Sequence, residues 1–243
     1  RPPRSTLFPY TTLFRSKIDP APSTALPSAK VDLKQLRLDI DTIIWLGHSS
    51  FYIQLAGKRI LIDPVLSPYA SPVSFSTKAF EGTSPYRPED FPSIDLLMIS
   101  HDHWDHLDYN TVKKLKDRIG AVICPLGVGE HFEYWGFDKE RLIELDWNED
   151  ANLAPGFMIH CLPARHFSGR GLTANQSLWA SFLLETPSQK IYIGGDGGYD
   201  THFAEIGNRF PDIDLAILEN GQYNEEWKLI HLMRSEEHTS ELQ

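Results

Sequence analysis

Short apolar runs separated by turn residues dominate the chain and predict a protein built largely from strands. Runs at 42–46, 51–55 and 59–62 are typical of strands, and the turn at 56–58 is expected to join the last two as a hairpin. Further strands are expected at 95–100, 121–124, 141–145, 157–162, 178–184, 190–193 and 214–218. The first part of the chain therefore predicts antiparallel pairing.

Helical spacing appears between the later strands. Residues 109–118 form an amphipathic pattern that places Val112, Leu115 and Ile119 on one side, and shorter helices are expected at 129–135 and 201–208. Early hairpins followed by alternating strands and helices favour an α+β fold in which mixed sheets pack between helices.

Metal-ligand side chains are concentrated directly after the apolar segment 95–100. The pattern H-x-H-x-D-H supplies His101, His103, Asp105 and His106, and imidazole and carboxylate groups suit zinc and related divalent ions. In an extended stretch His101 and His103 point the same way, so the later two ligands can face a second ion. The spacing suits two adjacent metals better than one, and the alternative is a solvated His-rich loop.

Three separated residues supply what a two-metal site would still lack. His166 follows the apolar run 157–162, Asp196 follows the strand at 190–193, and His231 lies in a later apolar stretch. Asp196 sits in a Gly-Gly-Asp-Gly-Gly turn, where no neighbouring side chain blocks close approach to an ion. This makes Asp196 the natural bridging ligand.

The order H-x-H-x-D-H, His, Asp, His resembles the metallo-β-lactamase superfamily. The closer resemblance is to its branch containing N-acyl-phosphatidylethanolamine-hydrolysing phospholipase D and bacterial relatives. The motifs behind that resemblance lie at 45–51, 61–67, 163–171, 177–182, 194–199 and 219–224, and together they span about residues 40–233. The resemblance implies an αββα sandwich with metals at one edge of the paired sheets.

The resemblance also implies a ligand set and an activity. His101, His103 and His166 would hold one metal, Asp105, His106 and His231 the other, and Asp196 would bridge them. The expected cofactors are two zinc ions, with iron or manganese as alternatives. A metal-bridging hydroxide would be the nucleophile, with Asp105 and Asp196 as catalytic carboxylates and Asp105 passing a proton to the leaving group.

The expected activity is that of a zinc-dependent phosphodiesterase of the phospholipase D type, acting on lipids like N-acyl-phosphatidylethanolamine. One alternative is a lactonase or other ester hydrolase of the same fold. The others are iron-dependent persulfide oxidation and an inactive fragment. Many relatives carry a charged residue shortly before the Asn of an Asn-x-x-Leu-Trp segment, whereas Thr173 and Ala174 precede Asn175 here, which weakens the inference of substrate.

Four further residues are candidates for support of the metals or contact with substrate. Asp63 is expected to orient a ligand histidine, because metal-bound imidazoles need an acceptor at the other nitrogen. His48 and Tyr223 are candidates for lining the site, and Arg170 for meeting a phosphate oxygen. The alternatives are a turn-forming Asp at Asp63, a loop histidine at His48 and a surface salt bridge at Arg170.

Composition limits the partners. The net charge of −10 over 243 residues gives no basic surface for nucleic acid, so the expected partner is a small-molecule or phospholipid substrate. No apolar run is long enough to span a membrane. A cytoplasmic or membrane-associated location with peripheral membrane contact is expected, while a signal peptide and the oligomeric state are left open. Cys124 and Cys161 both lie in apolar runs typical of buried thiols.

The two ends of the chain differ in character from the rest. Residues 1–16 and 234–243 resemble in-frame translations of sequencing adapters, so neither is expected to be native. Residues 17–41 are expected to form a linker or N-terminal arm, and residues 42–233 the hydrolase domain. On this interpretation the domain is truncated at its C-terminus, close to His231.

Overall fold

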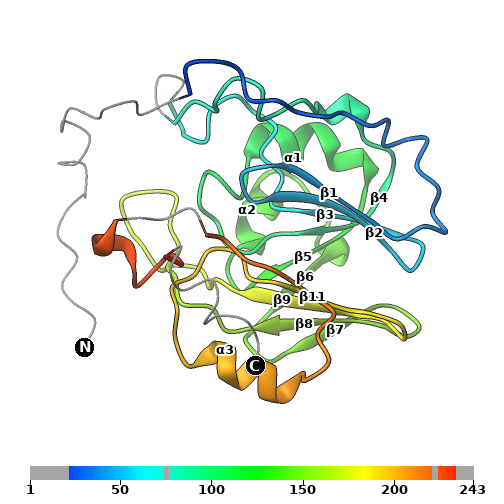
Figure 1. Cartoon of the computed structure of the whole chain (residues 1–243), viewed down its shortest axis with the longest axis vertical. Helices are drawn as coiled ribbons and strands as arrows, with labels where there is room; N and C mark the ends of the chain where they lie inside the picture. The colour runs from blue at the N-terminus through cyan, green and yellow to red at the C-terminus, as the bar shows by residue number, and fades with distance from the viewer. Residues whose placement is uncertain (1–21, 74–76, 221–223, 234–243) are drawn as a thin grey trace.

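Two β-sheets face each other across the centre of the molecule (Figure 1). The computed structural model describes residues 22–73, 77–220 and 224–233. In spatial order, the first sheet consists of β1 (Thr42–Gly47), β2 (Ser50–Leu55), β3 (Lys58–Ile62), β4 (Ile94–Met98), β5 (Ile119–Pro125) and β6 (Leu142–Leu145). The second consists of β11 (Leu215–Ile217), β10 (Lys190–Ile193), β9 (Ser181–Glu185), β8 (Phe157–Leu162) and β7 (Asp150–Ala154).

Both sheets are mixed. The first begins with antiparallel pairs from β1 to β3, and parallel pairs follow from β3 to β6. The tight β2–β3 connection depends on Ala56 and Gly57, which both have positive φ angles of 48° and 74°. Two successive residues with positive φ suit a hairpin turn whose twist matches that of the strands. The hairpin expected from the sequence is therefore present.

The space between the sheets is filled by side chains that alternate along the strands. Ile60 and Ile62 of β3 point into this layer, whereas Leu61 packs on the opposite face of the same sheet. Ile159 and Phe182 approach the layer from the second sheet, and all of these side chains are buried. Full burial of one such side chain contributes about 1.5–3 kcal/mol, so this alternation holds the two sheets together.

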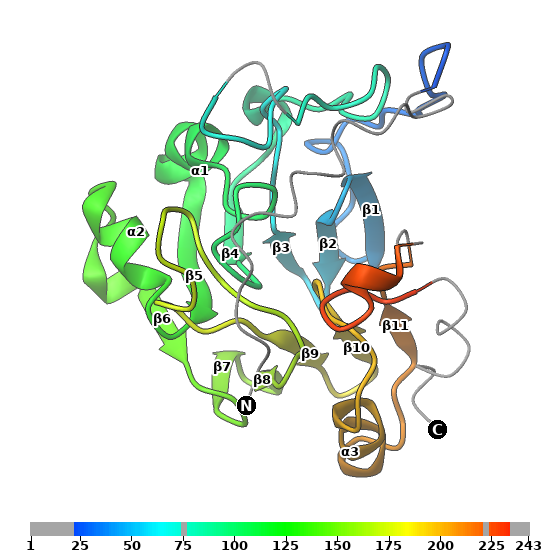
Figure 2. The same cartoon turned by 90° about the vertical axis from the view of Figure 1, so that its left-hand side faces the viewer.

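Helices cover the two outer faces (Figure 2). α1 (Tyr109–Leu115) and α2 (Gly129–Tyr134) lie on the first sheet, where Phe132 joins the outer core. α3 (His202–Arg209) lies on the second sheet and contributes Phe203 to a separate core cluster. The layers are therefore helix, sheet, sheet and helix, which confirms the predicted α+β sandwich.

Several predicted boundaries differ from the structure. β4 ends at Met98, two residues before the predicted end, and β7 was not predicted because its polar sequence lacks a strong apolar alternation. Ile119 is the first residue of β5 and not part of the α1 face, because the chain passes from α1 through a short 3-10 turn. The 3-10 segments are Pro88–Asp90, Lys116–Arg118, Lys139–Arg141 and Glu225–Trp227.

The segment before β1 packs against the first sheet. Residues 22–41 contain no helix or strand, yet Leu33 is fully buried in the outer core and the backbone N–H of Val31 donates to the Tyr86 hydroxyl at 3.0 Å. This part of the expected linker is thus an arm attached to the domain.

Four strands end at one edge of the sandwich. β3 and β4 run in parallel with Ile62 opposite Met98, and β10 and β11 run in parallel with Ile193 opposite Ile217. The polar residues that follow these strands are therefore brought to the same place, although they are far apart in the sequence. Within the described ranges, no helix is long and apolar enough to cross a membrane.

Candidate metal centre

Three imidazoles converge at this edge. His101 and His103 follow β4, and His166 follows β8. The His101 Nε2 and His103 Nδ1 atoms are 2.8 Å apart, and the His166 Nε2 and His103 Nδ1 atoms are 3.2 Å apart. Zinc–nitrogen bonds of about 2.0–2.1 Å in a tetrahedron place ligand nitrogens about 3.3 Å apart. The three nitrogens thus have nearly the mutual spacing of ligands on one ion.

The outer nitrogens of two of these rings are fixed by the protein. His166 Nδ1 donates to the carbonyl oxygen of Ile230 at 2.7 Å, and His101 Nδ1 lies 2.9 Å from the Ser100 hydroxyl oxygen. These partners place the ring protons on Nδ1 and leave each Nε2 lone pair directed at the cluster. Each ring is therefore oriented as a metal ligand would be.

Asp196 lies between two groups of imidazoles. Its Oδ2 atom is 3.2 Å from His106 Nε2, 4.0 Å from His166 Nε2 and 3.7 Å from His231 Nδ1. His101, His106 and Asp196 form one set of ligand atoms within 4.8 Å of one another, and His166, Asp196 and His231 form another. This is the geometry expected of a carboxylate shared by two ions.

The remaining predicted ligands, Asp105, His106 and His231, fall into two groups. Asp105 clusters with His106 and with His48, whose Nε2 atom is 3.1 Å from the Asp105 carboxylate. His231 clusters with Asp196 and His166. Glu219 accepts a hydrogen bond from His231 Nδ1 at 2.8 Å, and the assignment of His231 to the second ion stays a prediction.

Burial sets the protonation of the first three histidines. It lowers the pKa of His101 and of His103, and it lowers the pKa of His166 to about 3, because a buried imidazolium loses its hydration. These rings are therefore neutral near pH 7, which is the form that binds a metal. At His106 burial would also lower the pKa, but the negative charge of the Asp196 carboxylate outweighs burial and raises the pKa.

The two acidic residues at the centre remain ionised. Burial alone would raise the pKa of Asp196, but the charge of His106 and its neighbours holds it well below the usual range. The pKa of Asp105 is also lowered against burial, chiefly by its hydrogen bond with His48. The centre therefore combines ionised carboxylates with the neutral imidazoles of His101, His103 and His166, which are the forms that bind a divalent ion.

Asp63 takes the position expected for a residue that orients a ligand histidine. It follows β3, is 1% exposed, and its Oδ2 atom accepts a hydrogen bond from His106 Nδ1 at 2.9 Å. The same carboxylate accepts the Ser100 backbone N–H at 2.7 Å and the Ser100 hydroxyl at 2.6 Å. Asp63 therefore links the end of β3 to the start of the metal loop and reaches His101 through Ser100.

Glu219 performs the same task for His231 and was missed by the sequence reasoning. It follows β11, and its carboxylate accepts hydrogen bonds from the His231 ring, the Gly197 N–H at 2.8 Å and the Leu232 N–H at 3.3 Å. Burial raises the pKa of Glu219. At His231 burial would lower the pKa, but the hydrogen bond with Glu219 and the negative charge of Glu219 raise it. The sequence did contain a signal for this role, because Glu219 directly follows the strand expected at 214–218 and begins the motif at 219–224.

Arg170 has partners that differ from the phosphate contact expected of it. Its Nη1 atom donates to the backbone carbonyls of Asp102 at 2.9 Å and Leu107 at 2.6 Å, and the guanidinium lies 4.0 Å from the Trp104 ring centre. Burial lowers the pKa of Arg170 to about 10. The segment carrying the H-x-H-x-D-H motif turns sharply, so its free carbonyls need a donor, and Arg170 supplies it.

Tyr223 lies outside the described residues. Two other neighbours of the cluster have identified contacts. Phe167 packs against the His103 ring with centroids 4.4 Å apart, and Asp102 accepts the Gly169 N–H at 2.6 Å while lying 3.3 Å from His131 Nε2. These contacts fix the loops that carry the histidines.

The residues present fit a pair of divalent ions. His106 Nε2 is fully buried and makes no hydrogen bond, although it faces the Asp196 carboxylate. A buried nitrogen without a hydrogen bond is costly unless another ligand satisfies it. The mixture of imidazole and carboxylate donors matches the requirements of zinc, iron or manganese.

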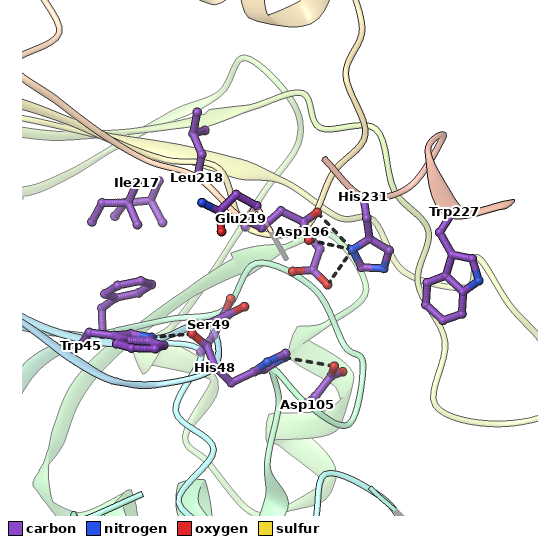
Figure 3. Close-up of a pocket in the computed structure, with 15 residues that line it drawn as sticks. Trp45, His48, Ser49, Asp105, Asp196, Ile217, Leu218, Glu219, Trp227 and His231 are labelled. Carbon is purple, nitrogen blue, oxygen red and sulfur yellow. Dashed lines mark hydrogen bonds and ion pairs between the residues drawn. The ribbon is translucent and has the colours of Figure 1, made fainter. Parts of the chain in front are cut away.

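A cavity of about 580 Å³ opens over one side of the centre (Figure 3). Asp105, Asp196 and His231 line it, together with Trp45 and Trp227. The volume is within the range of about 300–1,000 Å³ found for small-molecule sites. The candidate centre is therefore accessible to a substrate.

Comparison with known proteins agrees with this fold and centre. The sequence profile described as the beta-lactamase superfamily domain matches residues 58–240. The chain therefore belongs to the metallo-β-lactamase superfamily.

Relatives within the superfamily make the resemblance more specific. The chain is 38% identical over 212 residues to the protein Rv0906 of Mycobacterium tuberculosis, covering 87% of this chain and 57% of that protein. It is 32% identical over 193 residues to N-acyl-phosphatidylethanolamine-hydrolyzing phospholipase D 1 of Caenorhabditis elegans, covering 75% of this chain and 54% of that protein. The chain thus spans a little over half the length of these relatives.

A solved structure shows the same fold. The isothiocyanate hydrolase from Delia radicum gut bacteria superposes with a TM-score of 0.64 at 19% identity, covering 82% of this chain and 78% of that chain. At this identity the likeness concerns the fold. The chain is therefore placed in a superfamily of metal-dependent hydrolases by its sequence, its fold and its histidine–aspartate cluster.

Proposed function

We propose that the protein is a dinuclear zinc-dependent phosphodiesterase of the phospholipase D type, acting on lipids like N-acyl-phosphatidylethanolamine. The observation that supports it most directly is the position of Asp196, shared between two sets of imidazoles. The named activity of the Caenorhabditis elegans relative supports the phosphodiester substrate.

The proposed ligand set takes most of its members from the geometry of the cluster and the place of His231 from the family resemblance. His101, His103 and His166 are assigned to one ion, and Asp105 and His106 to the other. Asp196 is assigned as the bridge because its carboxylate faces both groups. His231 is assigned to the second ion, which requires its ring to turn or shift from the position in which Glu219 holds it.

The chemistry divides between the ions and the chain. When bound, two divalent ions supply Lewis acidity that activates water and offsets charge on phosphoryl oxygens. Asp105 is ionised and lines the cavity, where its carboxylate would carry a proton from the activated water to the leaving alkoxide. His48 holds the Asp105 carboxylate by a 3.1 Å contact and so fixes its direction.

Apolar side chains around the cavity support a lipid-like substrate. Trp45, Phe51, Ile217, Leu218 and Trp227 line it, and the Trp45 side chain is 66% exposed although it is one of the largest apolar groups in the chain. A large aromatic group left exposed beside a reactive centre is suited to contact with an apolar part of a substrate.

The test is hydrolysis by protein loaded with zinc, iron or manganese in parallel. We expect bis-p-nitrophenyl phosphate and vesicles containing N-acyl-phosphatidylethanolamine to be hydrolysed by the zinc-loaded protein, with metal analysis giving about two ions per chain. Hydrolysis of lactones with no turnover of either phosphodiester would replace this proposal with a lactonase. Oxygen consumption with a persulfide and one bound iron would replace it with an oxidation.

A further inference from the structure

A second cavity opens on the other side of the His48–Asp105 pair. It has a volume of about 530 Å³, close to that of the cavity in Figure 3, and both cavities are lined by His48 and Asp105. His103 also reaches the second cavity, so its inner end touches the candidate metal ligands. The reactive centre therefore has two separate spaces beside it.

The walls of the second cavity are mainly apolar or small. Val65, Ala70, Ala79 and Phe80 line it from the segment between β3 and β4, and Trp104 lines it from the metal loop. The Phe80 side chain is 48% exposed. Lys78 adds a charged side chain to the lining, and Ser67, Thr77, Thr83 and Ser84 add hydroxyl groups. The apolar side chains form a continuous part of the wall, and this part suits an aliphatic group.

Hydrogen bonds give this wall a fixed shape. The Ala70 N–H donates to the Thr77 carbonyl at 3.1 Å, and the Ala79 N–H donates to the Pro68 carbonyl at 3.0 Å. The Ser67 N–H donates to the Asp108 carboxylate at 3.1 Å, which ties the segment to the start of α1. These bonds hold the described residues of the wall in place, and a wall held in this way lowers the entropic cost of binding.

The end of β1 also packs closely against the wall of the second cavity. Gly47 has a φ of 108° and lies against the Thr83 carbonyl so tightly that a Cβ atom would overlap with it. Only glycine allows the β1–β2 turn, which carries His48, to approach this wall. The position of His48 between the two cavities therefore depends on the same contact.

We propose that this second cavity is the subsite for the aliphatic chain on one of the two ester arms of the substrate. The inference rests on the proposed function, because a phosphodiester carries two arms on one phosphorus atom. In an in-line displacement the leaving arm lies opposite the attacking water oxygen, whereas the retained arm lies to the side of that axis, so the two arms diverge and need separate spaces. The cavities on either side of Asp105 provide them.

The test compares p-nitrophenyl phosphodiesters whose second arm is methyl or hexyl. A fully buried methylene contributes about 0.8 kcal/mol, which is about a fourfold change in affinity, so the hexyl diester should have at least a tenfold higher kcat/KM. Ala79→Trp fills the cavity, and we expect it to bring the hexyl-to-methyl ratio close to one. Ala204→Trp, on the exposed face of α3, should keep the wild-type ratio.

A second variant removes apolar wall instead of filling the cavity. Phe80→Ala should lower the hexyl-to-methyl ratio at least threefold, whereas Val73→Ala, in the same segment but outside the lining, should not change it. Melting temperatures and metal content identify any variant that fails to fold. A wild-type ratio near one, or a ratio that neither Ala79→Trp nor Phe80→Ala lowers, would overturn the subsite.

Binding without turnover separates this inference from the proposed function. Octyl phosphate and methyl phosphate are titrated calorimetrically into wild-type protein and the Ala79→Trp variant. We expect octyl phosphate to bind at least tenfold more tightly to the wild type and to lose that advantage in the variant. If no phosphodiester is hydrolysed but this difference persists, the proposed function fails, and the cavity stands only as a site for an aliphatic chain. If both proteins bind octyl phosphate equally, the subsite is wrong.

Discussion

Replacing Asp63 by Asn should weaken metal binding far more than it weakens the fold. Asp63 Oδ1 accepts the Ser100 N–H, while Oδ2 accepts the Ser100 hydroxyl and the His106 ring N–H. An Asn that keeps its oxygen toward the Ser100 N–H directs its NH₂ group at His106 Nδ1. That nitrogen must then accept, so the ring proton moves to Nε2, the atom that faces Asp196.

The structure gives a magnitude for each effect. Loss of one buried charge-assisted hydrogen bond costs about 1.5–3 kcal/mol, so the free energy of unfolding of the metal-free protein should fall by about 2 kcal/mol. Removing the partner that orients a ligand histidine typically reduces metal affinity about 10–100-fold. We expect a loss in that range for the ion assigned to His106.

The assay is competition for zinc with a chromophoric chelator, together with urea unfolding of the metal-free protein. Asp95→Asn is the matched control, because Asp95 also accepts a backbone N–H, that of Arg59 at 2.9 Å, but lies at the opposite end of the same pair of strands. Its zinc affinity should stay within about twofold of wild type. Wild-type zinc affinity in Asp63→Asn, with the expected loss of stability, would refute the argument that Asp63 sets the His106 proton.

Three further predictions concern neighbouring groups. Asp196→Asn should lose bound metal and hydrolysis together, measured by metal analysis and turnover of bis-p-nitrophenyl phosphate; two ions and full rate would exclude Asp196 as the bridge. Glu219→Gln should lower zinc affinity about tenfold or more, since it removes the charged acceptor of His231 Nδ1, whereas exposed Glu226→Gln should not change it. The metal-free protein should lose stability as the pH falls from about 6.5 toward 3, because the unfolded chain takes up protons that buried His101, His103 and His166 exclude. The stability that these neutral rings contribute is fully present above about pH 6.5. Urea unfolding midpoints that do not fall over this pH range would contradict the burial of neutral rings.

Local patterns were sufficient to predict most elements of the fold. The strands β1, β2, β3, β8 and β10 were predicted within a residue or two, because each is an apolar run bounded by turn residues. β7 was missed because it has no such run. The layered sandwich itself came from the resemblance to a family, since periodicity does not specify which strands are neighbours.

The sequence also identified the chemically important residues more reliably than their partners. His101 and His103 were found because their spacing in an extended segment is a local property. Glu219 was missed, and the contacts of Arg170 were not anticipated, because both depend on segments that are distant in the sequence. The grouping of His231 with Asp196 was decided in the same way.

Residue types and their order determined by themselves that this chain carries a set of metal ligands at strand ends. Only the tertiary structure decided which ligand atoms share one space, which carboxylate holds each imidazole, and that two cavities meet at His48 and Asp105. The physical reason is that ligand choice is a matter of side-chain chemistry, whereas distances of a few ångströms between remote segments are set by the packing of the two sheets and the loops at their common edge.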